Sequence, residues 1–384
     1  MIRKIQTKTG VELILASMNR KTGDVFMTFK QTFPRIILAE VNTHTIASKN
    51  TSSSRAIPTL ASIMRVIKDP FMPVSIGQYQ SGMQAGQEIK GIRRKVNELL
   101  WLWGRYPMAL IAWLTFKLGA PKQFSNRLIE PWTWTEQIWS STDVENELML
   151  RDHHMAEPHY EILAHQKRIL IQKVRDYFAG VESPELRGKV QVLDIGEWHL
   201  PYVQMFHFKM QLNDARMQDL VTVTDDGIHF VDPKTNKVLF IENRKSEGLG
   251  RDLDIAKMVS AARCAWVSYL MPGEDSKKMN SITSALSTYW KLAGSDVRHL
   301  SPLQHQATPL PFSVRVGSHC GWLMARKELK GEAGGDKVVP SITPRMAFAL
   351  LDDAAKGAST DVMLKNLQGR FASEIMISTS KLAA

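Results

Sequence analysis

The spacing of apolar residues changes several times along this chain of 384 residues. Between positions 1 and 40, apolar and polar residues alternate in short stretches, at 11–15 and again at 25–29. Alternation of this kind is typical of strands whose two faces meet different surroundings. We therefore expect strands near the N-terminus, followed by a polar segment at positions 42–58.

Two later regions show helical spacing instead. Apolar residues recur every three or four positions across 90–120 and across 154–179, which predicts a substantial helix in each region. The most apolar stretch, 99–114, is interrupted by Gly104, Arg105 and Pro107 and is shorter than the roughly 20 residues of a membrane span. It predicts a buried helix, bent at Pro107, and no membrane partner.

The pattern becomes strand-like again near position 220. Short β-rich runs at 220–224, 228–231 and 238–241 are separated by turn residues, which predicts a small β-rich insertion at 206–255. A glycine-rich joint at 331–337 is followed by two weakly amphipathic helices. The chain is therefore expected to be an α/β protein with a core at 1–205 and 256–330, the insertion between them, and a linker with a helical C-terminal extension at 331–384.

Composition and charge limit the kind of protein, ligand and cellular compartment that we expect. A hydrophobic content of 44% is enough for a large folded core. The net charge of +11 suits nucleic acid, but equally a pocket for a phosphorylated nucleotide and a dinucleotide cofactor. Two cysteines, Cys264 and Cys320, are too few for a disulfide framework, and the N-terminus lacks a secretory pattern. We therefore expect a protein of the reducing cytoplasm.

The densest polar chemistry lies at positions 42–58. This segment contains one histidine, two asparagines, an arginine and many hydroxyl groups between apolar stretches. Such groups suit phosphates and the edges of heterocycles, although a polar loop by itself is more often a solvated connection. The neighbouring motifs favour the binding interpretation.

Several motifs follow one another along the chain. Their residues are Phe33-Pro-Arg35, Thr43-His44 with Ser48 and Asn50, Ser52-Ser-Ser-Arg-Ala-Ile-Pro58, Gly82-Met-Gln-Ala85, Lys122 to Pro131, Asn146 to Arg151, Gly196 to Tyr202, Ala262 to Leu270, and Ser301 to Pro309. In this order, the motifs resemble those of the long-form flavin-dependent thymidylate synthases, the ThyX family.

The resemblance implies an α/β fold, a homotetramer and non-covalently bound FAD. The implied reaction transfers a methylene group from methylenetetrahydrofolate to C5 of dUMP, with reduction through FAD at the expense of NADPH, to give dTMP. It also agrees with the cysteines, since neither Cys264 nor Cys320 lies in an obvious nucleophile context and a flavin route needs no activated thiolate.

The resemblance also assigns roles to individual residues. It implies that His44, Ser48, Asn50 and Asn146 contact the flavin. Ser53, Arg55, Arg127 and Arg151 would hold the nucleotide, and Ser53 and Arg151 would be catalytic. Arginine forks suit both a phosphate and a uracil carbonyl edge, whereas the alternative is that Arg127 and Arg151 form ordinary surface ion pairs.

Some positions differ from the family pattern. Thr45 stands where the family has an arginine, and Trp134 and Trp266 replace a histidine and an arginine. Three hypotheses follow: an active thymidylate synthase, an enzyme that modifies another deoxypyrimidine monophosphate such as dCMP, and a non-catalytic oligomeric relative that keeps the fold.

Two other interpretations have weaker support. His153, Glu157, Glu161 and His165 recur every four residues, as metal ligands on one helical face would, but Pro158 interrupts that helix, so no metal is expected. Nucleic acid binding would need basic residues beside exposed aromatic ones, whereas Trp101 and Trp103 lie in an apolar run. We therefore do not expect nucleic acid as a partner.

Overall fold

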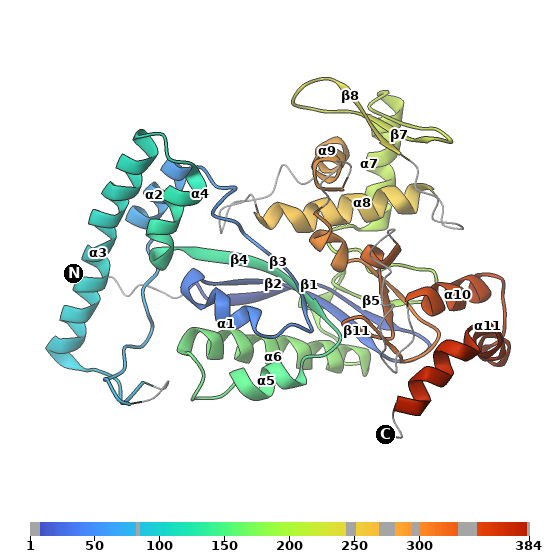
Figure 1. The fold of residues 1–384 in the computed structure, drawn as a ribbon, viewed down its shortest axis with the longest axis horizontal. Coiled ribbons are helices and arrows are strands. Elements are labelled where there is room, and N and C mark those ends of the chain that lie inside the picture. The colour runs from blue at the N-terminus through green and yellow to red at the C-terminus, as the bar shows by residue number, and fades with distance from the viewer. Residues whose placement is uncertain are drawn as a thin grey trace.

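The protein combines helices and strands, in agreement with the α/β class expected from the sequence. The computed structural model describes residues 8–81, 85–242, 251–268, 281–293, 299–328 and 344–381. Figure 1 shows a central sheet with helices on both of its faces and helical segments at both ends. This sheet positions the segments in which the sequence predicts binding residues.

The central sheet has five strands in the order β3-β4-β2-β1-β5. Neighbouring strands are antiparallel, apart from the parallel pair β1 and β5. Every residue of β4 is buried, because protein covers both faces of the sheet. The two strands predicted near the N-terminus are confirmed as β1 and β2. The strands are β1 (Gly10–Asn19), β2 (Val25–Pro34), β3 (Ser48–Thr51), β4 (Trp134–Ser141) and β5 (Val190–Leu193).

Helices α1 (Leu38–Asn42), α5 (Glu145–Arg151) and α6 (Pro158–Phe178) cover one face of the sheet. Pro158 does not interrupt α6 but begins it. The Glu157 carboxylate accepts hydrogen bonds from the backbone N–H groups of His159 and Tyr160, both at 2.9 Å. Proline is well suited to the first helical position because the N–H that it lacks would have no partner there.

This helix start separates the four residues considered as metal ligands. His153 and Glu157 precede α6, where Glu157 caps the helix, and His165 bonds to Asp152 at 3.2 Å. Over the described ranges, no three potential metal-binding side chains come together. The regular spacing in the sequence therefore does not correspond to one helical face.

The opposite face of the sheet is covered by α8 (Arg251–Ala265) and by short C-terminal strands. A chain of buried hydrogen bonds lies at this contact. His199 bonds to Ser17 at 2.7 Å and to Thr28 at 2.8 Å, Thr28 bonds to Ser140 at 2.7 Å, and Ser140 bonds to His305 at 2.8 Å. These buried groups form with one another the hydrogen bonds that water would otherwise provide, and they join the sheet to the C-terminal part of the chain.

The buried histidines make the fold sensitive to acid. Burial lowers the pKa of His305 and of His319 to about 3, and that of His159 to about 4. The unfolded chain therefore binds more protons than the folded one below about pH 6.5, so the free energy of unfolding should fall as the pH drops below that value. Chemical denaturation at a series of pH values measures this slope.

His305→Gln should reduce the slope by up to ~1.4 kcal/mol per pH unit, because glutamine cannot take up a proton. His207→Gln is the matched control, since His207 is exposed on the helix Met205–Met217. Equal slopes for both variants would contradict the assignment of acid sensitivity to the buried ring.

A helical unit lies at the β3 end of the sheet, seen on the left of Figure 1. It contains α2 (Thr59–Lys68), α3 (Gly91–Lys117), α4 (Lys122–Ser125) and the 3-10 helix η2 (Asn126–Trp132). The expectation that this helix is buried is wrong. Helix α3 continues through Pro107, which is exposed, so water can solvate the carbonyl group that proline leaves unpaired.

Much of α3 lies at the surface, and the described helices include none with the length and hydropathy that a bilayer crossing requires. Three short 3-10 helices lie between the elements described so far: η1 (Arg35–Ile37), η3 (Pro184–Leu186) and η4 (Trp266–Ser268).

The expected insertion at 206–255 contains a helix as well as strands. Helix α7 (Met205–Met217) precedes the antiparallel sheet β6 (Val221–Val223), β7 (Gly227–Val231) and β8 (Val238–Glu242). The three predicted strand segments are confirmed. Phe208 and Phe230 share a hydrophobic cluster with Ile255 of α8 and Leu286 of α9 (Ile282–Ala293), so this region packs on α8 and α9.

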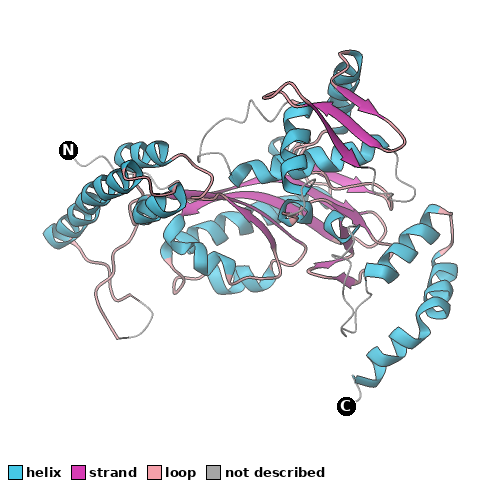
Figure 2. Ribbon diagram, turned by 45° about the horizontal axis from the view of Figure 1, so that its top comes forward, coloured by secondary structure: helices cyan, strands magenta, loops and turns pink. Residues whose placement is uncertain are grey.

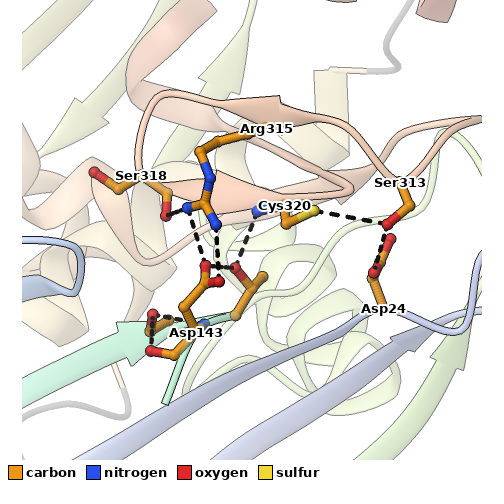
Figure 3. A network of polar contacts seen from close by, with 8 residues as sticks. Asp24, Asp143, Ser313, Arg315, Ser318 and Cys320 are labelled. Carbon is orange, nitrogen blue, oxygen red and sulfur yellow. Dashed lines mark hydrogen bonds and ion pairs between the residues drawn. The ribbon is translucent and has the colours of Figure 1, made fainter. Parts of the chain in front are cut away.

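The C-terminal part forms small antiparallel pairs and two helices. Figure 3 shows how it attaches to the core: Arg315 holds Asp143 through two hydrogen bonds of 2.8 and 3.1 Å, and the backbone N–H of Cys320 donates to Thr142 at 2.9 Å. The two predicted C-terminal helices are present, whereas the predicted joint at 331–337 lies outside the described residues. The elements are η6 (Ser301–Gln304), β9 (Ala307–Pro309), β10 (Arg315–Val316), β11 (His319–Cys320), β12 (Trp322–Met324), η7 (Ala325–Glu328), α10 (Pro344–Ala355) and α11 (Thr360–Lys381).

Candidate functional site

The polar segment 42–58 wraps around one edge of the central sheet. It leaves α1, pairs with β4 through the short strand β3, and continues to α2. Side chains alternate between the faces of a strand, so Ser48 and Asn50 point to one face of the sheet while Lys49 and Thr51 point to the other. The segment therefore contributes to two separate environments.

Ser48 and Asn50 hold the segment against the C-terminal part of the chain. The Ser48 hydroxyl is buried and lies 3.1 Å from Nε2 of His319. The Asn50 amide donates to the carbonyl oxygen of Cys264 at 2.9 Å. Both side chains thus have protein partners, and their predicted contacts with a flavin remain predictions.

On the other face, Lys49 fixes the loop that carries His44. Its ammonium group donates hydrogen bonds to the backbone carbonyls of His44 and of Val41, the latter at 2.8 Å. Burial lowers the pKa of Lys49 to about 8, although the nearby Glu147 carboxylate opposes the shift. In the sequence, Lys49 stands as a cation between Ser48 and Asn50, and the structure gives it this positioning contact with the His44 loop.

His44 and Arg151, which are far apart in the sequence, come into contact here. Nε of Arg151 donates to Nε2 of His44 at 3.2 Å, and Nη2 donates to the Thr43 hydroxyl at 3.3 Å. The guanidinium group also lies over the Tyr160 ring, 4.8 Å from its centre. Two of the five donor hydrogens of Arg151 are used in these bonds, so others can reach a ligand.

The environment of His44 favours the neutral imidazole. Burial lowers the pKa of His44 below its usual range, the Glu147 carboxylate opposes this, and the Arg151 cation reinforces it. Because Nε2 accepts the bond from Arg151, the proton of the neutral ring is on Nδ1. His44 therefore offers one N–H donor and no positive charge.

A buried ion pair lies beneath this contact. Nζ of Lys167 is 2.7 Å from a carboxylate oxygen of Glu147, to which the Tyr160 hydroxyl also donates at 3.2 Å. Burial raises the pKa of Glu147, but the charge and the hydrogen bond of Lys167, together with His44 and the Tyr160 hydroxyl, outweigh burial and hold that pKa below its usual range. Lys167 also lies 4.0 Å from the centre of the Trp139 ring.

The pairing of Lys167 with Glu147 could not be predicted from the sequence. Lys167 occupies a position in the apolar stripe of α6, four residues after Leu163 and four before Ile171. A single charge in such a stripe points to a buried partner, but it does not identify that partner.

Asn146, the fourth residue predicted to contact the flavin, lies on α5 and is exposed. It is five residues before Arg151, so the two side chains point to different faces of the helix.

The predicted nucleotide-binding arginines Arg55 and Arg127 share a second location. They line an open hollow of about 510 Å³ together with Pro121, Gln123 and Phe124. Nε of Arg55 donates to the Gln123 side chain at 3.1 Å, which orients its guanidinium group. Two arginines beside one hollow suit an anionic ligand such as a phosphate.

Ser53 lies in the same turn as Arg55, and its hydroxyl accepts a bond from the Arg55 backbone N–H at 3.3 Å. The buried Asn126 amide fixes this turn through bonds to the carbonyls of Ser54 and Ile57, at 2.7 and 2.9 Å. Arg151 is not among the residues that line the hollow. The described chain therefore groups Arg151 with His44, and Arg55 with Arg127 and Ser53.

Behind the same turn is a smaller cavity of about 40 Å³, lined by Arg35, Ser52, Arg65 and Trp134 among others. Arg35 donates to the carbonyl of Ser52 at 2.9 Å and pairs with Glu130 at 3.0 Å. The Trp134 N–H is buried and finds no acceptor among the described groups. A cavity of this size holds a few water molecules, which would satisfy such a donor.

Comparisons with known proteins give a weak structural likeness. Neither a protein-family model nor a curated protein matches the chain. Two solved structures of the flavin-dependent thymidylate synthase ThyX from Helicobacter pylori, each with FAD and dUMP, align at 18% identity and a TM-score of 0.25. The aligned part covers 37% of this chain and 65% of theirs. A likeness of this size does not establish a family.

Proposed function

We propose that this protein binds FAD and a deoxypyrimidine monophosphate and acts as a flavin-dependent thymidylate synthase-like enzyme. The observation that supports the proposal most is the contact between His44 and Arg151. The sequence motifs assign these residues independently to the flavin and to the nucleotide, and 107 positions separate them along the chain. A shared ligand site requires such segments to meet.

The side chains suit these ligands chemically. The neutral His44 ring can donate from Nδ1 to an acceptor on the flavin, and the exposed Asn146 amide offers a donor and an acceptor. Arg55 and Arg127 would bind the nucleotide phosphate from their shared hollow, with Ser53 in the same turn as Arg55. The free edge of Arg151 would face a pyrimidine carbonyl and polarise the ring for reaction at C5.

The proposed reaction joins a methylene group from methylenetetrahydrofolate to C5 of dUMP, from which the C5 proton leaves. Bound FAD, once reduced by NADPH, would supply the hydride that converts the methylene group into the methyl group of dTMP. In this chain Arg151 and Ser53 would hold the nucleotide during these steps. We also propose a homotetramer in the cytoplasm, where the thiols of Cys264 and Cys320 remain reduced.

An absorbance spectrum and a thermal shift assay test this proposal. The purified protein should show the flavin band, or gain it on addition of FAD, and dUMP should raise its melting temperature. If dCMP raises it more than dUMP, the substrate is the other nucleotide. No response to FAD or to either nucleotide would overturn the proposal in favour of a non-catalytic relative.

A matched pair of variants locates the nucleotide. Arg55→Gln removes one guanidinium group from the hollow and should weaken dUMP binding roughly ten- to a hundredfold. Arg20→Gln is the control, because Arg20 pairs with Asp194 at the surface outside the hollow. Equal dUMP affinities in the two variants would count against the hollow as the phosphate site.

A further inference from the structure

Helix α3 presents a long row of apolar side chains to the surface. Figures 1 and 2 place α3 at the outer edge of the molecule. The row follows a strict spacing of four and three residues over seven positions. These are Ile92 (78% exposed), Val96 (47%), Leu99 (45%), Trp103 (68%), Tyr106 (45%), Leu110 (56%) and Trp113 (39%), which we call the α3 seam.

The opposite side of α3 is already occupied. The Trp101 indole donates to the carbonyl of Phe71 at 2.8 Å, and Met108 packs on the cluster formed by α2 and η2. Thr115 donates to the Ser125 hydroxyl at 3.1 Å. Since Trp101, Met108 and Thr115 are themselves seven residues apart, the inward face fixes the helix and leaves the α3 seam pointing outward.

The spacing of the α3 seam identifies the kind of surface that fits it. Alternating steps of four and three residues give a mean period of 3.5, which is the period of helices that pack along one another as a coiled coil. Monomers rarely expose continuous apolar patches larger than roughly 300–600 Å², and seven large side chains in one row, three of them aromatic, favour a protein partner.

We infer that a second copy of this chain packs its own α3 along this seam, antiparallel and about a two-fold axis. This pairing deepens the self-association in the proposed function, but it rests on α3 alone and not on the flavin or nucleotide site. In a dimer with a two-fold axis, both copies use the same surface for the contact. An apolar row that packs well against a second copy of itself therefore requires no other protein.

Charge favours the antiparallel direction. The first turn of α3 carries Arg93, Arg94 and Lys95, and the last turn carries Lys117. Arg94 already pairs with Glu88 and Glu98 of its own chain, so a parallel pair would bring together the other four cations, Arg93 and Lys95 of each copy. An antiparallel pair separates the first turns by about 30 Å and places each beside the carbonyl end of the other helix, where the helix dipole favours cations and the one opposing charge is Lys117.

The seam also sets a register. The α3 seam alternates between the a and d positions of a heptad, and in antiparallel coiled coils an a position faces a d position of the partner helix. One alignment pairs every seam residue from Val96 to Trp113 in this way. In it, Val96 faces Trp113 of the second copy, Leu99 faces Leu110, and Trp103 faces Tyr106. Trp113 thus meets Val96, the smallest side chain of the row, at each end of the contact, and the aromatic rings of Trp103 and Tyr106 meet near its centre.

Cysteine cross-linking tests the register. In a Cys320→Ser background, Leu99→Cys and Leu110→Cys chains with different tags are co-expressed and then oxidised; the native Cys264 is buried. The inference expects a disulfide between the two kinds of chain and none when either variant is expressed alone. A disulfide within Leu99→Cys alone would indicate a parallel pair, and no disulfide in any sample would also overturn the inference.

Light scattering tests the surface independently. Trp103→Glu should halve the mass of the particle at micromolar concentration while circular dichroism shows a folded chain. Tyr79→Glu is the control, since Tyr79 is 98% exposed but lies outside α3. An unmodified protein that is monomeric, or that binds vesicles of anionic lipid through Trp103, contradicts the pairing. If the chain forms the α3 pair but binds no flavin, the proposed function is overturned while the pairing stands.

Discussion

Lys167→Met is expected to lower the free energy of unfolding by about 3–5 kcal/mol, because it leaves the Glu147 carboxylate buried without its cation. Lys167 is fully buried and Glu147 is 4% exposed, so water cannot replace the lost partner. Denaturant unfolding followed by circular dichroism measures the change.

Two further variants test this cause. Lys173→Met, six residues later on α6, removes a cation from an exposed pair with Glu185 and should change the free energy of unfolding far less, because water and salt screen that pair. The double variant Lys167→Met with Glu147→Leu should recover much of the loss, because no unpaired charge remains. An equal effect of the two single substitutions would show that burial of the ion pair is not the cause.

The effect of Lys167→Met should also depend on pH. Without the cation, burial raises the pKa of Glu147 above its ordinary value of 4.5. The folded variant then binds a proton that the unfolded chain releases, so its deficit in stability should grow as the pH rises above about 4.5. A deficit that stays constant between pH 4 and pH 8 would contradict this.

Arg151→Met is expected to weaken FAD and dUMP binding by about a hundredfold or more, because it removes charge-assisted hydrogen bonds and frees the loop of His44. The change in stability should be small, since Arg151 is only partly buried. Fluorescence titration with each ligand and a melting curve separate the two effects. Arg151→Lys should not restore binding, because an ammonium group cannot reproduce the planar fork.

Arg175→Met is the control, because Arg175 forms an exposed pair with Glu145 of the same helix as Arg151. A second readout is the pH profile of FAD binding. Protonated His44 cannot accept the bond from Arg151, so binding should decline in acid, below the usual histidine pKa of 6.5. Loss of the Arg151 cation should move this decline to higher pH. Unchanged affinity in Arg151→Met would exclude Arg151 from the site.

Much of the local structure can be read from the sequence. Alternating polarity identified β1, β2 and the strands of the insertion, and helical spacing identified α3 and α6, because the burial of one face of an element repeats with the period of that element. The burial of α3 could not be predicted in this way. Its apolar residues surround most of the helix, and whether the second face is covered depends on what packs there.

For the candidate site, the sequence by itself determined which residues carry suitable chemistry: the histidine, asparagines, serines and arginines of segment 42–58 and of the later motifs. Tertiary structure alone decided their grouping. It placed Arg151 on His44, Arg55 beside Arg127, and Ser48 and Asn50 against the C-terminal part. It also paired Lys167 with Glu147, since contacts between distant segments depend on the packing of whole elements, whereas the period of an element is a local property of the chain.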